Sequence, residues 1–195
     1  IVSRLDVGTS GLMLVCKSDL AYTEMRRQFA EHEVKKTYHA LVQGGLKENK
    51  ATIEAPIGRA KVSDFRFCVT PAGKPAVTHW DVLERFGHEA TLVSVNLETG
   101  RTHQIRVHMK HIGHVLFNDE RYGGHEILKG THFSKYKQFV NNCFDTCPRQ
   151  ALHAMTLGFV HPVTGEEMHF TSELPDDMTR LIEKWRGYIS NRELE

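Results

Sequence analysis

Residues 91–113 read TLVSVNLETGRTHQIRVHMKHIG and predict a strand followed directly by a helix. Residues 91–97 alternate along the chain and are rich in β-branched side chains, a pattern typical of strands. Thr102 then offers a helix cap, and Gly113 offers a helix stop. Between them, one helical face is formed by Ile105, His108, Met109 and Ile112. The spacing therefore predicts a helix with one buried face.

The same helix carries a second face, on which His103, Arg106 and Lys110 lie together. A helix N-terminus adds partial positive charge and free backbone N–H groups, which suit a phosphate or a carboxylate. These features predict an anion-binding helix start. A solvated basic face explains the same pattern equally well.

Further strands are predicted on both sides of this stretch. The continuous apolar run at residues 11–16 indicates a buried strand, and the alternation at residues 38–42 indicates another. Residues 155–160 and 167–171 bracket a Pro-Val-Thr-Gly turn at residues 162–165, which predicts a hairpin.

Three more amphipathic helices complete the predicted elements. One follows Ser18 or Asp19, either of which can cap it; another follows Ser134; the last is entered through Pro175. Because strands and helices are interspersed without regular βαβ alternation, the sequence predicts an α+β fold.

Asp6 is the first candidate for chemistry, in the stretch RLDVGTSG at residues 4–11. It precedes Gly8 and Gly11, which allow a tight backbone path, so its carboxylate can project from the sheet. The alternative is an Asx turn, in which Asp6 bonds only its own backbone. The turn considered alone favours that alternative.

Tyr38, in the run Lys36-Thr37-Tyr38, is the second candidate. A tyrosine flanked by basic residues can stack on a nucleobase, and it can equally be part of the core of a half-buried strand.

Charge along the chain is uneven, although the formal net charge of the 195 residues is only +1. Residues 101–114 carry arginine, lysine and histidine without an acid, and residues 59–74 carry Arg59, Lys61, Arg66 and Lys74. Acidic residues gather instead near residues 166–177. This pattern fits an RNA-facing side, and solvated charged faces are the alternative.

The cysteine, histidine and apolar content argues against three further classes: disulfide-rich, metal-binding and membrane-spanning proteins. Four cysteines in 195 residues form neither a disulfide framework nor a zinc knuckle, so we expect reduced thiols in a cytoplasmic protein. The histidines of residues 103–114 lack the spacing of a helical zinc site, and we expect no metal. No apolar run approaches the roughly 20 residues needed to span a bilayer, so no membrane partner is expected.

Together, four ordered motifs resemble those of the RluA-type pseudouridine synthases. They are residues 3–11 with Asp6, the strand of Lys36, Tyr38 and Ala40, the complete match at residues 100–108, and residues 149–154 followed by His161-Pro162. The spacer at residues 133–147 and the C-terminal helix are most similar to the RluD branch, which modifies large-subunit ribosomal RNA.

This resemblance implies a mixed, mostly antiparallel sheet flanked by helices, with the catalytic cleft across the sheet. It implies an isomerase that converts uridine to pseudouridine in RNA, acting as a monomer without a cofactor. Asp6 would act on the sugar, Arg106 would keep Asp6 ionised, and Tyr38 would stack on the uracil. The RNA contacts would come from Arg4, Thr9, Lys36, Arg59, Arg66, Arg101, His103, Gln104 and Leu152.

The chain departs from the family pattern at Ser3, where histidine is frequent, and this puts an RNA contact at that position in question. An upstream strand and an S4-type RNA-binding module are also expected but absent, so residues 1–195 are interpreted as an N-terminally truncated catalytic domain. The rival hypotheses are a tRNA-modifying relative, a non-catalytic factor that holds rRNA during ribosome assembly, and an aspartyl phosphotransferase.

Overall fold

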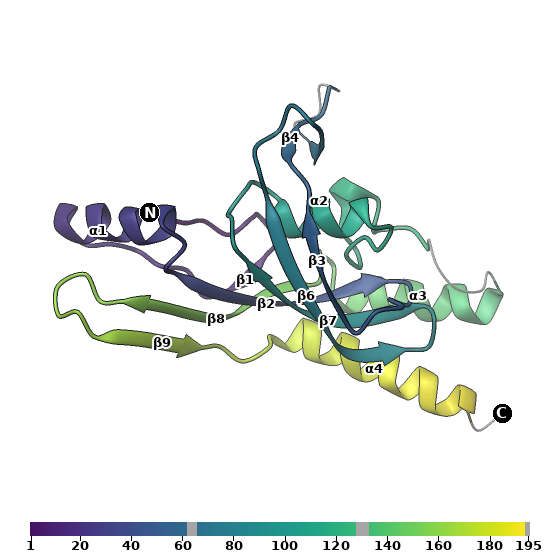
Figure 1. Cartoon of the computed structure of the whole chain (residues 1–195). Coiled ribbons are helices and arrows are strands. Elements are labelled where there is room, and N and C mark those ends of the chain that lie inside the picture. Colours follow the sequence, from purple (N-terminus) through teal and green to yellow (C-terminus); the bar gives the residue numbers. More distant parts are fainter. Residues whose placement is uncertain (62–65, 128–132, 194–195) are drawn as a thin grey trace.

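A seven-stranded sheet forms the centre of the protein in the computed structural model, which describes residues 1–61, 66–127 and 133–193 (Figure 1). Its strand order is β1-β8-β2-β7-β6-β3, and β9 pairs with β8. Every pairing is antiparallel except the parallel pairing of β1 with β8. The strands are β1 (Ser10–Gly11), β2 (Lys35–Gln43), β3 (Lys50–Glu54), β6 (Val77–Phe86), β7 (Ala90–Leu97), β8 (Leu152–Val160) and β9 (Glu167–Thr171).

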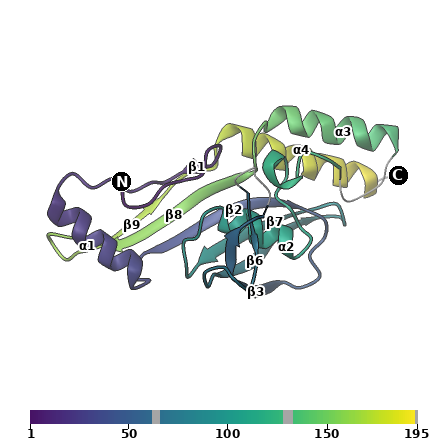
Figure 2. The same ribbon diagram turned by 90° about the horizontal axis from the view of Figure 1, so that it is seen from above.

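Helices cover both faces of this sheet, which confirms the predicted α+β fold. α2 (Gln104–His111) packs Ile105 and Met109 on one face, and α3 (Ser134–Thr146) and α4 (Asp176–Glu193) cover the other. Alternation along β2 explains the division, because Ala40 belongs to the first core cluster and Leu41 to the second. Figure 2 shows α3 and α4 side by side at one end, and α1 (Asp19–Ala30) at the other.

A separate two-stranded sheet projects from the main one. Its strands are β4 (Ile57–Arg59) and β5 (Phe67–Val69), and it is inserted between β3 and β6 (Figure 1). We call the described residues 57–61 and 66–69 the β4–β5 hairpin. A third small core lies beneath this hairpin and consists of Ile57, Ala76, Val107, Val115 and Tyr122, with Phe67 and Val69 packed against it.

Two local predictions are wrong. Residues 11–16 form no buried strand beyond Gly11: Met13 and Val15 are exposed, and β9 occupies the edge of β8 from Thr156 onward. The competing strand comes from far along the chain, so the apolar run could not reveal it. Thr102 also does not cap α2; the N-cap position is His103, in a left-handed conformation with φ of 56°.

Several other boundaries follow the sequence closely. The Ser18 side chain accepts a hydrogen bond from the backbone N–H of Ala21 and caps α1, and α2 stops before Gly113, whose φ is 84°. All four cysteines are free; Cys143 and Cys147 are buried, whereas Cys16 and Cys68 are half-buried. Across the described ranges, no helix combines the length and apolar character needed to cross a membrane.

Candidate active site

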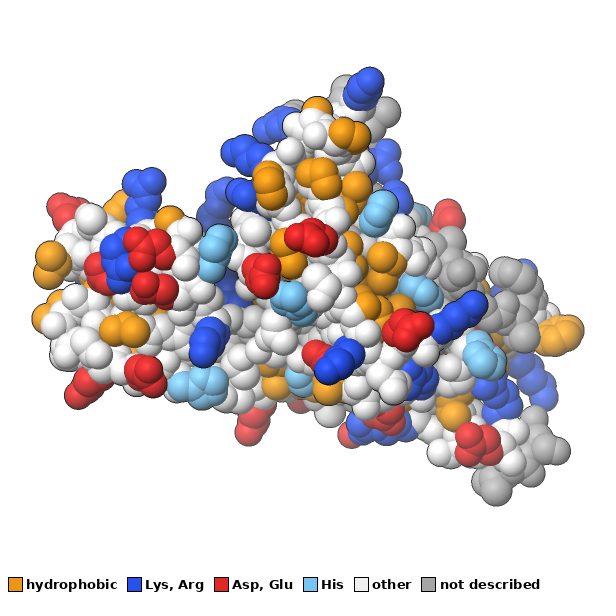
Figure 3. Space-filling model, viewed as in Figure 1, with side chains coloured by type: hydrophobic (Ala, Val, Ile, Leu, Met, Phe, Trp, Pro, Cys, Tyr) orange, Lys and Arg blue, Asp and Glu red, His pale blue; other side chains and the backbone are white. Residues whose placement is uncertain are grey.

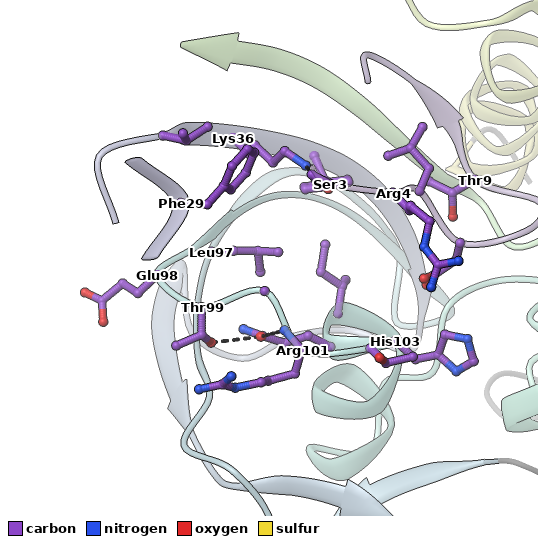
Figure 4. Close-up of a pocket in the computed structure, with 18 of the residues that line it drawn as sticks. Ser3, Arg4, Thr9, Phe29, Lys36, Leu97, Glu98, Thr99, Arg101 and His103 are labelled. Atoms are coloured by element: carbon purple, nitrogen blue, oxygen red, sulfur yellow. Dashed lines mark hydrogen bonds between the residues drawn. The ribbon is translucent and has the colours of Figure 1, made fainter. Parts of the chain in front are cut away.

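A cavity of about 670 Å³ opens where the N-terminal segment, α1, β2 and the start of α2 meet. Asp6 and Tyr38 both line it, and they arrive from a loop and a strand that are far apart in the sequence. Figure 4 shows Phe29 and Lys36 on one side of this cavity and Arg101 and His103 on the other. The predicted catalytic residues Asp6 and Tyr38 are therefore brought to one site.

The loop that carries Asp6 is held by hydrogen bonds from Arg149 and Gln150, the two residues that shortly precede β8. Arg149 donates from Nη1 to the carbonyl oxygen of Gly8 at 2.9 Å, and Gln150 donates from Nε2 to that of Val7 at 2.7 Å. The turn itself is closed by the backbone, since the N–H of Thr9 donates to the carbonyl of Asp6 at 2.9 Å. The carboxylate of Asp6 is thereby left to face the site, with its side chain 25% exposed.

Arg106 lies directly behind Asp6, with Nη1 of the arginine 3.5 Å from Oδ2 of the aspartate. Its other two nitrogens are held by Asp119: Nε and Nη2 each donate to one carboxylate oxygen at 2.8 Å. Both side chains of this second pair are buried, and the Asp119 side chain is 0% exposed. Such bidentate pairs fix the plane of a guanidinium, so the third nitrogen is aimed at Asp6.

Asp119 is the main site residue that the sequence did not indicate. It lies in the turn between α2 and α3, where Asn118 adopts a left-handed φ of 59° and the Gly124 N–H donates to the Asp119 carbonyl. Nothing in the sequence indicates that the Asp119 carboxylate folds back onto Arg106. The solvated basic face offered as one interpretation of α2 is wrong for Arg106, which is 5% exposed.

Charge and burial have opposite effects on the pKa of Arg106. Burial lowers the pKa of the guanidinium, but the hydrogen bonds and charge of Asp119, together with the charge of Asp6, raise the net pKa above its ordinary value. Arg106 is therefore a permanent cation that two carboxylates share.

Tyr38 contributes an apolar wall with a protonated phenol. The residue is 7% exposed, and burial, with a smaller contribution from the charge of Asp6, raises its pKa to about 12. Leu152 also lines the cavity and begins β8, the strand that pairs with β2. The β2–β8 pairing shifts register between Thr37 and Tyr38, and such irregularities redirect side chains near active sites.

The residues predicted to contact RNA fall into two groups. The group lining the cavity contains Arg4, Thr9, Lys36, Arg101, His103, Gln104 and Leu152. Lys36 donates to Oγ of Ser3 at 2.6 Å and lies 5.5 Å from the centre of the Phe29 ring, and burial lowers its pKa. Arg59 and Arg66 belong to the other group, because they lie on the β4–β5 hairpin and outside the lining.

Gln104 is occupied within the protein and is 2% exposed. Its Oε1 accepts from Oγ1 of Thr99 and the backbone N–H of Arg101, and its Nε2 donates to the Val77 carbonyl and to Thr78 Oγ1. The amide of Gln104 therefore holds the segment that leads into α2.

Three of the histidines near α2, His103, His108 and His114, have separate hydrogen-bond partners. Nδ1 of His103 lies 2.7 Å from Oη of Tyr122, and Nδ1 of His114 lies 2.8 Å from the Gln43 carbonyl oxygen. His108 is buried and bridges Thr78 and the Ala55 carbonyl. The described residues contain no group of three or more His, Cys, Asp or Glu side chains arranged to hold a metal ion.

Comparison with known families and sequences gives one consistent result. The family model described as RNA pseudouridylate synthase matches residues 1–111. The chain is 46% identical over 186 residues to the uncharacterized RNA pseudouridine synthase YlyB of Bacillus subtilis, covering 95% of this chain and 55% of that protein. It is 43% identical over 186 residues to the ribosomal large subunit pseudouridine synthase D of Vibrio vulnificus, with the same two coverages. The chain thus spans about half the length of these curated relatives.

Two solved structures resemble the fold. Human RNA pseudouridylate synthase domain containing 1 superposes with a TM-score of 0.69 at 27% identity, covering 95% of this chain and 79% of the human chain. Human RNA pseudouridylate synthase domain containing 4 gives a TM-score of 0.71 at 20% identity, covering 95% and 75%, and supports the fold alone.

Proposed function

The chain belongs to the RNA pseudouridylate synthase family, and from that premise we propose that it isomerises uridine to pseudouridine in large-subunit ribosomal RNA. The names of the relatives from Vibrio species support this substrate. The observation that carries the proposal is the carboxylate of Asp6, which lines the cavity and lies 3.5 Å from the buried cation Arg106.

The proposed reaction breaks the N1–C1′ bond of uridine and forms a C5–C1′ bond. The uracil turns between these events, N1 gains a proton, and the proton on C5 is lost, so the atoms balance without a further reactant. Asp6 acts at the sugar, either as a nucleophile on C1′ or as the anion beside an electron-poor sugar intermediate. Both roles require an ionised carboxylate, and the Arg106 cation favours that form.

The uracil is proposed to lie between Tyr38 and Leu152. Both residues line the cavity and are almost fully buried, so they present apolar surface to the two faces of a flat base. The phenol of Tyr38 is protonated near neutral pH and, with its pKa raised to about 12, stays protonated well into the alkaline range. It can therefore donate a hydrogen bond to the turning base.

Extruding the uridine from its stack costs a few kcal/mol. We propose that cations around the cavity offset this cost by binding phosphates. Arg4, Lys36 and Arg101 line the cavity, and Arg59 and Arg66 extend the charge onto the β4–β5 hairpin.

Tritium release from RNA labelled at C5 of uridine tests this function with the full-length protein. Transcripts of large-subunit rRNA and of tRNA are compared, and mass spectrometry locates each pseudouridine. Release from the rRNA is expected. Release from tRNA alone would replace the proposed substrate, and tight rRNA binding with no release from either RNA would support a non-catalytic assembly factor instead.

A further inference from the structure

The β4–β5 hairpin is a basic projection whose base lies beside the candidate active site. Figure 3 shows Lys and Arg side chains on several sides of this projection. Three of its described residues are cations, Arg59, Lys61 and Arg66, and a fourth cation, Lys74, bonds to its first strand through the backbone of Ile57. Arg59 and Phe67 form a direct pair, because the guanidinium lies 5.8 Å from the centre of the Phe67 ring. A displacement of the Arg59 side chain is therefore expected to disturb the Phe67 ring directly.

Tyr122 joins this hairpin to the cavity wall. The backbone N–H of Phe67 donates to Oη of Tyr122 at 3.2 Å, and Oη lies 2.7 Å from Nδ1 of His103. His103 lines the cavity, and its ring packs edge-on against both Phe67 and Tyr122 with centroids 5.6 Å apart in each case. The phenol oxygen is thus the point at which the hairpin, α2 and the cavity wall meet.

The direction of the hydrogen bond between Tyr122 and His103 follows from the protonation states of the two side chains. Burial raises the pKa of Tyr122 and lowers that of His103, so the phenol is protonated and the imidazole is neutral at pH 7. Since Oη accepts from the Phe67 N–H, its own hydrogen is free to be donated to Nδ1 of His103.

The aromatic ring of Tyr122 also contacts Arg106. The guanidinium carbon lies 5.0 Å from the centre of the Tyr122 ring, and Nζ of Lys110 lies 5.8 Å from it. A buried aromatic ring beneath a guanidinium contributes cation–π attraction and limits its tilt. Tyr122 therefore contacts both Arg106, the cation that faces Asp6, and Phe67 of the hairpin.

We infer that Tyr122 is a positioning residue that couples the β4–β5 hairpin to Arg106, so that RNA phosphates held by the hairpin steady the cation behind Asp6. The inference rests on the proposed function. It adds a role for a residue that the sequence did not single out, and it makes the hairpin part of the chemical step as well as of RNA binding.

Tyr122→Phe is the first test, because it keeps the ring against Arg106 and removes only the hydroxyl. We expect kcat for the labelled rRNA to fall about 3- to 10-fold, the equivalent of one or two neutral hydrogen bonds, while the Kd for RNA changes less than about 2-fold. Tyr136→Phe is the matched control, since Tyr136 is a buried tyrosine of α3 in the core cluster beneath α3 and α4. It should leave kcat unchanged.

A double-mutant cycle with Arg59→Ala tests the coupling itself. In the wild-type background, Arg59→Ala should weaken RNA binding and also lower kcat about 3-fold, because the hairpin no longer steadies Arg106. In the Tyr122→Phe background, the loss of binding should persist and the loss of kcat should disappear. A residue with a merely structural role would not separate the two effects in this way.

Equal loss of kcat from Arg59→Ala in both backgrounds would overturn the inference, and so would a Tyr122→Phe variant no slower than Tyr136→Phe. If Tyr122→Phe does not fold at the assay temperature, Phe67→Leu disturbs the same junction from the hairpin side and replaces it in the cycle. An inactive wild-type protein would instead contradict the proposed function, so the two failures are distinguishable.

Discussion

Nη1 of Arg106 lies 3.5 Å from Oδ2 of Asp6, which is longer than the 2.8 Å of either contact between Arg106 and Asp119. The arginine is thus hydrogen-bonded to the buried carboxylate of Asp119 and lies farther from the partly exposed carboxylate of Asp6. This asymmetry suits the proposed reaction, because Asp6 stays ionised without being locked into a bidentate pair and remains able to approach a sugar.

Asp119→Asn should lower kcat about 100-fold, because an amide cannot accept both guanidinium hydrogen bonds and a small misplacement of a catalytic group is costly. The affinity for RNA should change little, since Asp119 is 0% exposed. Single-turnover rates and filter binding measure the two quantities separately.

Glu89→Gln is the control for Asp119→Asn. Glu89 is also a buried carboxylate paired with an arginine, Arg192 of α4, but it lies outside the cavity lining. Both variants should lose about 1–3 kcal/mol of stability. Equal kcat values in the two variants would show that Asp119 has no special relation to the site.

Gly8→Ala should lower kcat about 10- to 100-fold by displacing the Asp6 loop. Gly8 has a φ of 86°, and an added Cβ would lie 2.7 Å from Oε1 of Gln150, the residue that anchors this loop. Gly165→Ala is the matched control, since its φ is 72° and no other atom lies within 4 Å of an added Cβ. Similar melting temperatures with a selective loss of kcat in Gly8→Ala are expected. Full activity of Gly8→Ala would mean that the loop position does not limit the rate.

Tyr38 should make the stability of the protein depend on pH in the alkaline range. Its folded pKa of about 12 exceeds the ordinary value of 10.0, so folding favours the protonated phenol. That contribution is complete below about pH 10 and is lost as the pH rises toward 12. Between about pH 8 and about pH 11, wild type should lose about 1.4 kcal/mol more than Tyr38→Phe.

Urea unfolding at each pH measures this difference. Burial also raises the pKa values of Cys143 and Cys147, but these thiols are common to both proteins and cancel in the comparison. Parallel stability curves for wild type and Tyr38→Phe would contradict the buried environment assigned to the phenol.

Arg4→Ala should reduce the salt dependence of RNA binding. Arg4 is exposed and lines the cavity, and removing one phosphate contact should lower the slope of log K against log salt by about 0.7 for single-stranded RNA. Arg186→Ala serves as the control, because Arg186 lies on α4 and pairs with Glu84. An unchanged slope in Arg4→Ala would remove this residue from the RNA-binding surface.

Most of the secondary structure could be predicted from the local periodicity of apolar residues. The faces of α2, α3 and α4 were predicted because residues three and four apart bury together. The predicted strand at residues 11–16 is longer than β1, because β9 pairs with the same edge of β8 from Thr156 onward. That pairing depends on residues far away in the sequence. The placement of Asp6 and Tyr38 at one site was implied by the family resemblance and could not be obtained from either motif alone.

The supporting residues escaped prediction for a physical reason. Asp119 precedes a short 3-10 helix (Glu120–Tyr122) and Tyr122 ends it, and the roles of both residues arise from their contacts with Arg106. Gln104 was predicted to contact RNA from its position in the third motif, whereas its amide is occupied by four bonds within the protein. Side-chain partners set by tertiary packing leave no periodic trace in a sequence.

The most direct test of the central claim compares wild type with Asp6→Asn in the release of tritium from C5-labelled uridine in rRNA. Asp19→Asn, which changes an aspartate in the first turn of α1, is the control. We expect release by wild type and Asp19→Asn and none by Asp6→Asn, with RNA binding retained in all three. Release by Asp6→Asn at the wild-type rate would contradict the assignment of Asp6 as the catalytic residue.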